Sequence, residues 1–379
     1  MGGFQGDFVS QTCAQLGSVA IRAAVERSGL AASKIDEVIM GCVLPAGQGQ
    51  APARQAALGA GLPLGTGCTT INKMCGSGMR AAMFAHDMLL AGSVEVMVAG
   101  GMESMSTAPY LLPKARGGMR LGHGEVKDHM FLDGLEDAYD KGRLMGSFAE
   151  ECADSYKFTR EAQDAFAIAS TTRAKQAGDD GSFDWEIAPV TVSGKKGDTV
   201  VRHDEQPAKA NLEKISSLKA AFRKDGTVTA ANSSSISDGA AALVMMRASS
   251  AEALGLKPLA RLVAHATHAQ EPNLFTTAPV GAIKTLLTKT GWTTDSVDLW
   301  EINEAFAVVT MAAMTELKLP HDKVNIHGGA CALGHPIGAS GARIMVTLIG
   351  ALRETGGKRG VAALCIGGGE ATAVGIELC

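Results

Sequence analysis

Apolar positions along the chain fall into two kinds of run, and each kind predicts an element. Short, mostly apolar runs, such as residues 94–98 and 361–366, predict strands that are buried on both faces. Between these runs lie apolar helical patterns of about 10 to 15 residues. Strands that alternate with helices in this way are typical of an α/β protein with parallel sheets covered by helices on both faces.

The same plan occurs twice along the chain. Gly29 and Gly291 each end a helical pattern that leads into a predicted strand, and they stand 262 positions apart. Gly78 and Gly341 each open an apolar helix and stand 263 positions apart. Because the spacing holds over several elements, we predict two α/β halves of the same plan that pack against each other.

The first half is interrupted by a polar stretch, roughly residues 106–235, which delays its expected last strand at residues 240–246. In the second half the equivalent strand, residues 371–376, follows at once. We predict that the inserted stretch is a lid over a site between the halves; a surface insertion without function is the alternative. The predicted units are an N-terminal half (1–105 plus 237–257), an inserted loop domain (106–236) and a C-terminal half (258–379).

Charge and cysteine content exclude several classes of protein. The 35 Lys and Arg against 39 Asp and Glu give a net charge of -4, which does not favour a nucleic-acid partner or a polybasic membrane anchor. No apolar run approaches the roughly 20 residues of a membrane-spanning helix. The 8 cysteines include no C-x-x-C pair, so we predict reduced thiols in a cytoplasmic protein, with neither a disulfide framework nor a metal site.

Cys75 lies at a predicted turn between a strand and a helix, with small residues directly after it. Such a turn aims the amides of the helix N-terminus at the sulfur, and the sequence therefore predicts a nucleophilic thiol whose thiolate form is favoured. The following Gly76-x-Gly78 pattern is also compatible with a dinucleotide fingerprint. A nicotinamide or flavin site would require an acidic residue at the end of the next strand, where the chain has Gly100 and Gly101.

A histidine and a second cysteine are predicted to face the same cleft. Glycine makes up 46 of 379 residues, about 12% where about 7% is usual, and the segment 325–341 around His335 is dense in it. The internal repeat places His335 near the counterpart of the Cys75 turn, at the interface of the halves. Cys365 ends a predicted strand, and α/β sheets bind ligands at the carboxyl ends of their strands.

Four motifs in order resemble the thiolase family, in particular its acetyl-CoA acetyltransferases, and the resemblance covers the whole chain. They are Asn72-Lys73-Met74-Cys75-Gly76-Ser77-Gly78, Asn303-Glu304-Ala305-Phe306, Gly334-His335-Pro336 and Cys365-Ile366-Gly367-Gly368-Gly369. The resemblance implies two βαβαβαββ halves in a five-layered α/β arrangement with an inserted loop domain that binds coenzyme A. It also implies acetyl-CoA, acetoacetyl-CoA and CoA as substrates, no separate cofactor, a homodimer or homotetramer, and a place in fatty acid metabolism.

The resemblance also implies a role for each residue of the site. Cys75 attacks the thioester, His335 holds or takes the thiol proton, and Cys365 is the acid and base that acts on the second substrate. Asn303 positions a water that forms one oxyanion hole with His335. The backbone N–H groups of Cys75 and Gly367 form the other.

Coenzyme A contacts are implied for five further residues: Ser234, Phe222, Met145, Phe306 and, as a cation for the 3′-phosphate, Lys209. The chain departs from the family in three places. Leu144 stands where acetoacetyl-CoA thiolases often have His. Residues 232–238 resemble degradative 3-ketoacyl-CoA thiolases more closely, and a strand that usually comes before the segment starting at Gly2 is missing. We therefore expect either a start that is wrongly assigned or an N-terminal sheet that is one strand short.

Three other functions remain possible at this stage. One is a degradative 3-ketoacyl-CoA thiolase that accepts longer acyl chains. Another is a decarboxylating ketoacyl synthase, which would need His or Asn where Cys365 stands. The third is a catalytically inactive CoA-binding or lipid-carrier protein, which would bind CoA without thiolysis.

Overall fold

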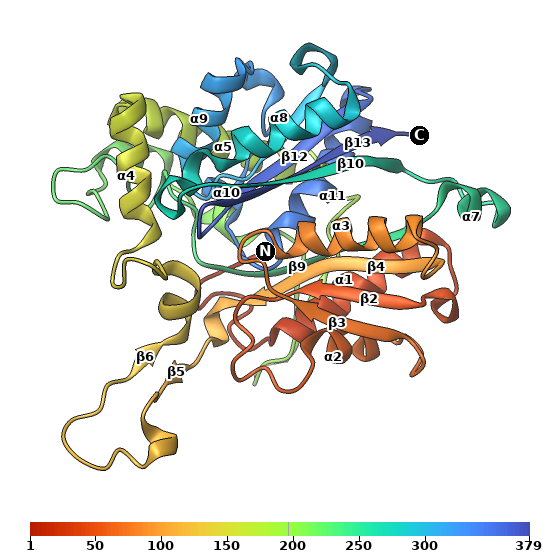
Figure 1. Ribbon diagram of the computed structural model, residues 1–379, viewed down its shortest axis with the longest axis horizontal. Coiled ribbons are helices and arrows are strands. Elements are labelled where there is room, and N and C mark those ends of the chain that lie inside the picture. The colour runs from red at the N-terminus through yellow and green to blue at the C-terminus, as the bar shows by residue number, and fades with distance from the viewer. Residues whose placement is uncertain (196) are drawn as a thin grey trace.

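The structure, a computed structural model, describes residues 1–195 and 197–379. Its core contains two sheets, one of five strands and one of four, in which the corresponding strands follow the same order (Figure 1). The first has the order β1-β9-β4-β2-β3, and its strands are β1 (Gly2–Gly3), β2 (Glu37–Gly41), β3 (Gly67–Ile71), β4 (Val96–Ser104) and β9 (Ser237–Met246). The second has the order β10-β13-β12-β11, and its strands are β10 (Ala260–Ala269), β11 (Leu299–Ile302), β12 (Arg359–Ile366) and β13 (Glu370–Leu378).

Helices lie on both faces of each sheet and produce five layers, α-β-α-β-α, as the thiolase-like arrangement requires (Figure 1). One outer layer is α1 (Cys13–Ser28) and α2 (Pro52–Gly59), which cover the first sheet. The central layer is α3 (Ser77–Leu90) and α11 (Ser340–Thr355), which pack against each other between the sheets. The other outer layer is α8 (Ala278–Thr290) and α9 (Ala307–Leu317) on the second sheet.

The predicted repeat corresponds to real structural pairs. Strands β2 and β11 begin 262 positions apart, and α3 and α11 begin 263 positions apart. The counterpart of β3 in the second half is reduced to one parallel bridge between Trp300 and Val324.

The predicted parallel pairing is present at β2, β3 and β4 and at β11 and β12, but each sheet also contains antiparallel strands. β2 pairs in parallel with β3 and β4, but β9 is antiparallel to β4 and β13 is antiparallel to β12. The reason is visible in the second half. Only the short turn at residues 367–369 joins β12 to β13, and a connection of that length can only reverse the chain.

The chain between β4 and β9 forms the predicted insertion. It contains a two-stranded arm and a second hairpin, together with helices that cover the edge of the second half. Its elements are β5 (Tyr110–Leu111), β6 (Lys127–Asp128), α4 (Met145–Tyr156), α5 (Arg160–Asp179), β7 (Val190–Val192), β8 (Thr199–Val201) and α6 (Glu205–Lys209). Two short helices complete the fold, α7 (Ala248–Ala253) and α10 (Ala330–Leu333). No helix within the described residues is long and apolar enough to cross a membrane.

Candidate active site

Cys75 lies in the turn that joins β3 to α3. The turn is tight because Met74 adopts φ 46°, in the left-handed region that non-glycine residues rarely occupy. Two hydrogen bonds hold this conformation: the Lys73 N–H donates to Ser77 Oγ at 2.8 Å, and the Ser77 hydroxyl donates to the Met74 carbonyl at 2.6 Å. Strained backbone of this kind concentrates at functional sites, where it aims a side chain.

The turn is fixed against the hairpin that joins β12 to β13 in the other half. Lys73 forms an ion pair with Glu370, and a Cβ added to Gly76 would lie 2.4 Å from Ile366 Cδ1. The Gly367 backbone N–H lies near enough to the sulfur of Cys75 to work against the rise in the pKa of its thiol. The site is therefore built from both halves, as the sequence repeat predicts.

The Cys75 thiol differs from the sequence prediction in one respect. Burial raises its pKa to about 11, although the N–H groups of Gly367 and of Cys75 itself work in the opposite direction. The helix N-terminus therefore does not stabilise the thiolate enough to keep it in the free enzyme. The free energy needed to remove the charge from water exceeds the stabilisation that these N–H donors provide. The resting group is a thiol, so the reaction needs a base.

Cys365 is the penultimate residue of β12 and is buried. Burial and the nearby Cys75 raise the pKa of its thiol well above the usual value. Gly367, two residues later, is half-exposed, and a Cβ added there would meet only Met145 Sδ at 3.5 Å. The structure thus brings both thiols together around an amide that remains open to a substrate.

His335 is buried, and its imidazole is positioned through one nitrogen only. Nδ1 lies 2.6 Å from Ser340 Oγ, and the Ser340 hydroxyl donates to the Pro336 carbonyl. Since Ser340 has a single hydroxyl hydrogen, this network places a hydrogen on His335 Nδ1 and leaves Nε2 as an acceptor. Nε2 has no hydrogen-bond partner among the described residues, and burial lowers the pKa of His335 to about 3. The resting imidazole is therefore neutral, and Nε2 is the nitrogen that can accept a hydrogen bond or a proton.

Asn303 follows β11 and is 1% exposed. Its backbone N–H donates to the Ala363 carbonyl at 3.0 Å, but neither Nδ2 nor Oδ1 has a hydrogen-bond partner among the described residues. A buried amide without partners costs stability, and this is the expected state of a group that holds a water or substrate oxygen. The observation fits the role that the resemblance implies for Asn303.

Two buried carboxylates that the sequence reasoning left without a role hold the loops around the site. Glu103 accepts hydrogen bonds from the backbone N–H groups of Val43, Leu44 and Gly338. Glu304 accepts from the Ser170 hydroxyl at 2.7 Å, the Asn325 amide at 2.8 Å and the Cys331 N–H at 3.1 Å. The sequence signal for Glu103 was its place directly after Gly100-Gly101-Met102, and the signal for Glu304 was its place directly after Asn303 at the end of a strand.

Four of the five predicted CoA contacts lie together in the structure. Phe222 packs edge to face on Phe306 with ring centroids 5.9 Å apart, and Met145 lies in the same apolar cluster, which also contains Cys365. The Ser234 hydroxyl donates to the Ala305 carbonyl at 3.0 Å, next to Phe306. These side chains therefore surround the approach to Cys365.

Lys209 is placed differently. Its ammonium pairs with Glu205 on the same short helix, α6, which packs against β1, α5 and α10. The Glu205 carboxylate also accepts from the N–H groups of Gly3 and Asp7. Lys209 is therefore already neutralised by a carboxylate that holds the N-terminal segment.

One group of described residues has the composition of a metal site, and it lies outside the thiol centre. His86 and Asp87 on α3 and His265 on β10 place one ligand atom each within 4.8 Å of one another. The Asp87 carboxylate lies 2.8 Å from His265 Nε2 and 3.3 Å from His86 Nδ1. These contacts account for the cluster as an imidazole-carboxylate network that joins the two halves.

A thiol at a strand-to-helix turn, a second buried thiol and a neutral imidazole, all at the interface of two repeated α/β halves, define a cysteine-dependent acyltransferase. Comparison with known proteins identifies the family. Residues 1–249 match "Thiolase, N-terminal domain" and residues 256–378 match "Thiolase, C-terminal domain". The chain belongs to the thiolase family.

The relatives that resemble the chain do so over its full length. The acetyl-CoA acetyltransferase of Schizosaccharomyces pombe is 48% identical over 379 residues, which cover 100% of this chain and 96% of that protein. The mitochondrial acetyl-CoA acetyltransferase of Rattus norvegicus is also 48% identical over 379 residues, covering 100% of this chain and 88% of that protein. The crystal structure of the Bacillus anthracis acetyl-CoA acetyltransferase superposes with a TM-score of 0.96 at 42% identity, covering 100% of this chain and 96% of the other.

Proposed function

We propose that the protein is an acetyl-CoA C-acetyltransferase. It condenses two acetyl-CoA molecules to acetoacetyl-CoA and CoA, and it catalyses the reverse thiolysis, through an acetyl group carried on Cys75. The observation that supports this most strongly is the pair of neighbouring thiols, Cys75 and Cys365, with the Gly367 N–H beside Cys75. A condensing transferase needs one group to carry the acyl chain and another to remove a proton from the second substrate.

In the first half-reaction the Cys75 sulfur attacks the carbonyl carbon of acetyl-CoA, and its proton passes to His335 Nε2. The bond to the CoA sulfur breaks, and the CoA thiolate takes the proton of Cys365. The result is acetyl-Cys75, neutral CoA, a protonated His335 and a Cys365 thiolate. This thiolate is a strong base because its pKa lies well above the usual value.

In the second half-reaction the Cys365 thiolate removes a proton from the methyl group of a second acetyl-CoA. The carbanion attacks the carbonyl of acetyl-Cys75, and the bond to sulfur breaks as His335 returns its proton to Cys75. The thiol and imidazole groups are then as they began. N–H donors aimed at the developing oxyanions contribute about 10²–10³ in kcat per donor in other acyl-transfer enzymes, and the Gly367 N–H lies beside the Cys75 thiol.

We propose that the pantetheine arm of CoA lies along Ser234, Phe222, Met145 and Phe306. The support is that these side chains cluster beside Cys365. Lys209 remains our proposal for the 3′-phosphate contact, and such a contact requires it to leave Glu205. We propose no metal and no cofactor beyond the CoA thioesters.

The decisive experiment is mass spectrometry of the protein after incubation with acetyl-CoA. We expect one added acetyl group, on the peptide that contains Cys75. Cys75→Ser should abolish it, whereas the control Cys68→Ser, which alters a half-buried thiol on β3, should retain it. Folded protein that takes up no acetyl group on Cys75 would disprove the proposed intermediate and favour an inactive CoA-binding protein.

A broader-chain 3-ketoacyl-CoA thiolase is the second candidate. It is favoured by Leu144, which is the N-cap of α4 directly before Met145, and by the sequence of residues 232–238. The two candidates differ in kcat/KM for acetoacetyl-CoA against 3-ketohexanoyl-CoA and longer substrates. We expect a preference for acetoacetyl-CoA; a preference for the longer substrates would assign the second function.

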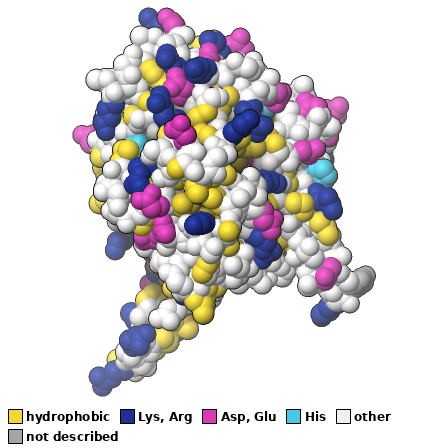
Figure 2. All heavy atoms as spheres, turned by 90° about the vertical axis from the view of Figure 1, so that its right-hand side faces the viewer, with side chains coloured by type: hydrophobic (Ala, Val, Ile, Leu, Met, Phe, Trp, Pro, Cys, Tyr) yellow, Lys and Arg dark blue, Asp and Glu magenta, His cyan; other side chains and the backbone are white. Residues whose placement is uncertain are grey.

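We also propose a homodimer or homotetramer that works in cytoplasmic fatty acid metabolism. Assembly is supported by the arm formed by β5, β6 and the loop between them, which projects from the body (Figures 1 and 2). It exposes large apolar side chains, namely Tyr110, Leu112, Met119, Leu121 and Val126. Light scattering on the purified protein and on a chain with residues 113–124 replaced by a short Gly-Ser turn would test the role of the arm in assembly.

A further inference from the structure

Three side chains from the two halves converge outside the thiol centre. His86 and Asp87 lie on α3, and His265 lies on β10. α3 begins two residues after Cys75, and β10 is an edge strand of the second sheet (Figure 1). The two imidazole rings lie edge to face with centroids 5.2 Å apart, and one oxygen of Asp87 contacts both. The cluster therefore bridges the halves of the fold.

The spacing of the three polar atoms is close to that of a metal centre. Asp87 Oδ1 lies 3.3 Å from His86 Nδ1 and 2.8 Å from His265 Nε2, and all three atoms lie within 4.8 Å of one another. Zinc bonds of about 2.0–2.2 Å in a tetrahedron place neighbouring ligand atoms about 3.3 Å apart. The first distance already matches, and the second requires a shift of about 0.5 Å, which the exposed Asp87 side chain can make.

The donor set is the one that zinc and similar ions prefer. Imidazole nitrogen together with carboxylate oxygen suits Zn²⁺ and its neighbours in the first transition row. Burial lowers the pKa of His265, although Asp87 acts in the opposite direction, so this ring is neutral at neutral pH and has a lone pair to share. Ligation by His265 Nε2 and His86 Nδ1 keeps the hydrogen of each neutral ring on its other nitrogen.

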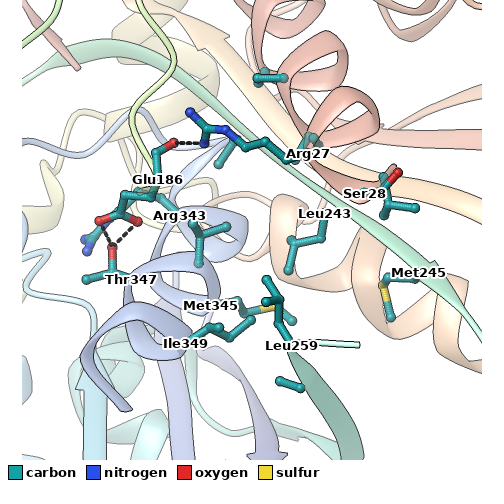
Figure 3. Close-up of a pocket in the computed structure, with 18 of the residues that line it drawn as sticks. Arg27, Ser28, Glu186, Leu243, Met245, Leu259, Arg343, Met345, Thr347 and Ile349 are labelled. Carbon is teal, nitrogen blue, oxygen red and sulfur yellow. Dashed lines mark hydrogen bonds between the residues drawn. The ribbon is translucent and has the colours of Figure 1, made fainter. Parts of the chain in front are cut away.

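The surroundings leave the carboxylate available to a cation. Among the described residues Asp87 has no Lys or Arg partner, and the nearby Lys289 ammonium donates to the His265 carbonyl at 3.0 Å. On another side His86 borders an apolar groove, where Figure 3 shows Leu243 and Met245. An apolar shell of this kind limits the access of water to metal ligands and strengthens their bonds to the ion.

We propose that His86, Asp87 and His265 form a binding site for a divalent transition-metal ion of the zinc type. The ion bonds to His86 Nδ1, Asp87 Oδ1 and His265 Nε2, and a water completes the tetrahedron. The reaction proposed for the thiols uses no metal, so the ion has a structural role. It joins α3 of the first half to β10 of the second, and it stabilises the folded protein by mass action.

The experiment titrates Zn²⁺ into the folded protein after treatment with a chelator, and it measures the heat of binding and the melting temperature. We expect a saturable site and a melting temperature that rises with the Zn²⁺ concentration. His265→Gln should weaken this binding at least about tenfold, because it removes one of three ligands. His268→Gln is the matched control: it alters a half-buried histidine of the same strand that contacts Gln270 instead, and it should bind as the wild type does.

Further measurements separate this site from other ways of binding zinc. Asp87→Asn keeps an oxygen that accepts a hydrogen bond but loses the charge, so it should weaken Zn²⁺ binding with little effect on the metal-free melting temperature. Co²⁺ should show the visible absorption of a tetrahedral site without the near-ultraviolet band of a cobalt-thiolate bond. Mg²⁺ should not raise the melting temperature, because it prefers oxygen ligands. His86→Gln replaces His265→Gln if the latter unfolds the chain.

Four results would overturn the proposal. Absent Zn²⁺ binding, or equal affinity in the wild type and the ligand variants, would show that the cluster is only a hydrogen-bond network. A thiolate band that accounts for all the bound Co²⁺ would place the ion at the cysteines. An equal loss of affinity in His268→Gln would show binding by scattered histidines. Equal stabilisation by Mg²⁺ would show attraction to charge alone.

Discussion

Glu103 accepts a hydrogen bond from the backbone N–H of Gly338 at 2.8 Å, and this contact joins the first half to the loop that carries His335. The same carboxylate holds the N–H groups of Val43 and Leu44, so one buried side chain ties three backbone donors together. A glutamine has the same shape, but its NH2 group cannot accept a hydrogen bond from these backbone N–H groups. We expect Glu103→Gln to lower the free energy of unfolding by about 1–3 kcal/mol and kcat by about tenfold.

Urea denaturation and initial rates measure the two effects, with Glu252→Gln on exposed α7 as the control. Burial raises the pKa of Glu103 to about 7, so the folded state keeps a proton that the unfolded chain has lost above about pH 4.5. The contribution of Glu103 to stability must therefore fall as pH rises from 4.5 to 7. The stability gap between wild type and variant should narrow over that window; a gap that widens would contradict the assignment.

Glycines let the two central helices touch backbone to backbone. A Cβ on Gly78 would lie 2.8 Å from the Ala342 nitrogen, and a Cβ on Gly341 would lie 2.4 Å from the Met79 nitrogen. We expect Gly78→Ala and Gly341→Ala each to destabilise the protein by roughly 3 kcal/mol or more, since α3 and α11 must move apart. Gly178→Ala in α5 meets nothing within 4 Å and should be neutral or stabilising by up to about 1 kcal/mol. The measurement is the melting temperature of each variant. Equal melting temperatures for all three variants would refute the close packing.

Asn303 separates activity from stability. Its buried amide has no partner among the described residues, so removing it takes away an unsatisfied polar group. We expect Asn303→Ala to reduce kcat by about 10²–10³ while the melting temperature stays the same or rises. A large fall in melting temperature together with the lost activity would mean that Asn303 is structural.

The pH dependence of Cys75 alkylation should be that of a resting thiol and not that of a stabilised thiolate. Because burial raises the pKa of Cys75 to about 11, the thiolate fraction increases about tenfold per pH unit up to that value. Alkylation of Cys75 by iodoacetamide, measured by mass spectrometry on the Cys75 peptide, should rise steadily from pH 6 to 9. Cys75→Ser identifies the signal, and a plateau near pH 7 would show instead a stabilised thiolate.

Cys365→Ala should uncouple the two half-reactions. Cys75 and its base remain, so the variant should still acquire an acetyl group, although more slowly because the leaving CoA thiolate loses its proton donor. Condensation and thiolysis should fall by at least about 10³, since no group is left to move the methyl proton. Normal turnover by this variant would disprove the acid and base role of Cys365.

Much of the site could be predicted because its residues are consecutive or repeat at a constant spacing. A cysteine followed closely by glycine, as at Cys75 and Cys365, predicts a turn at the end of a strand. The repeat of Gly78 at Gly341 then places both turns at one interface. The roles of Glu103 and Ser340 were not predicted. Their roles depend on which backbone groups or side chains of distant segments come within hydrogen-bond distance.

The sequence by itself determined the order of elements, the two halves and the residue types at the centre, because hydrophobic periodicity and the repeat are local properties. Tertiary structure decided the rest. It made the Cys75 thiol a weaker acid than its helix N-terminus suggests, since burial outweighs two N–H donors. It paired Lys209 with Glu205 and reversed β9 and β13 against their neighbours, because charge pairing and strand direction depend on what lies nearby in space.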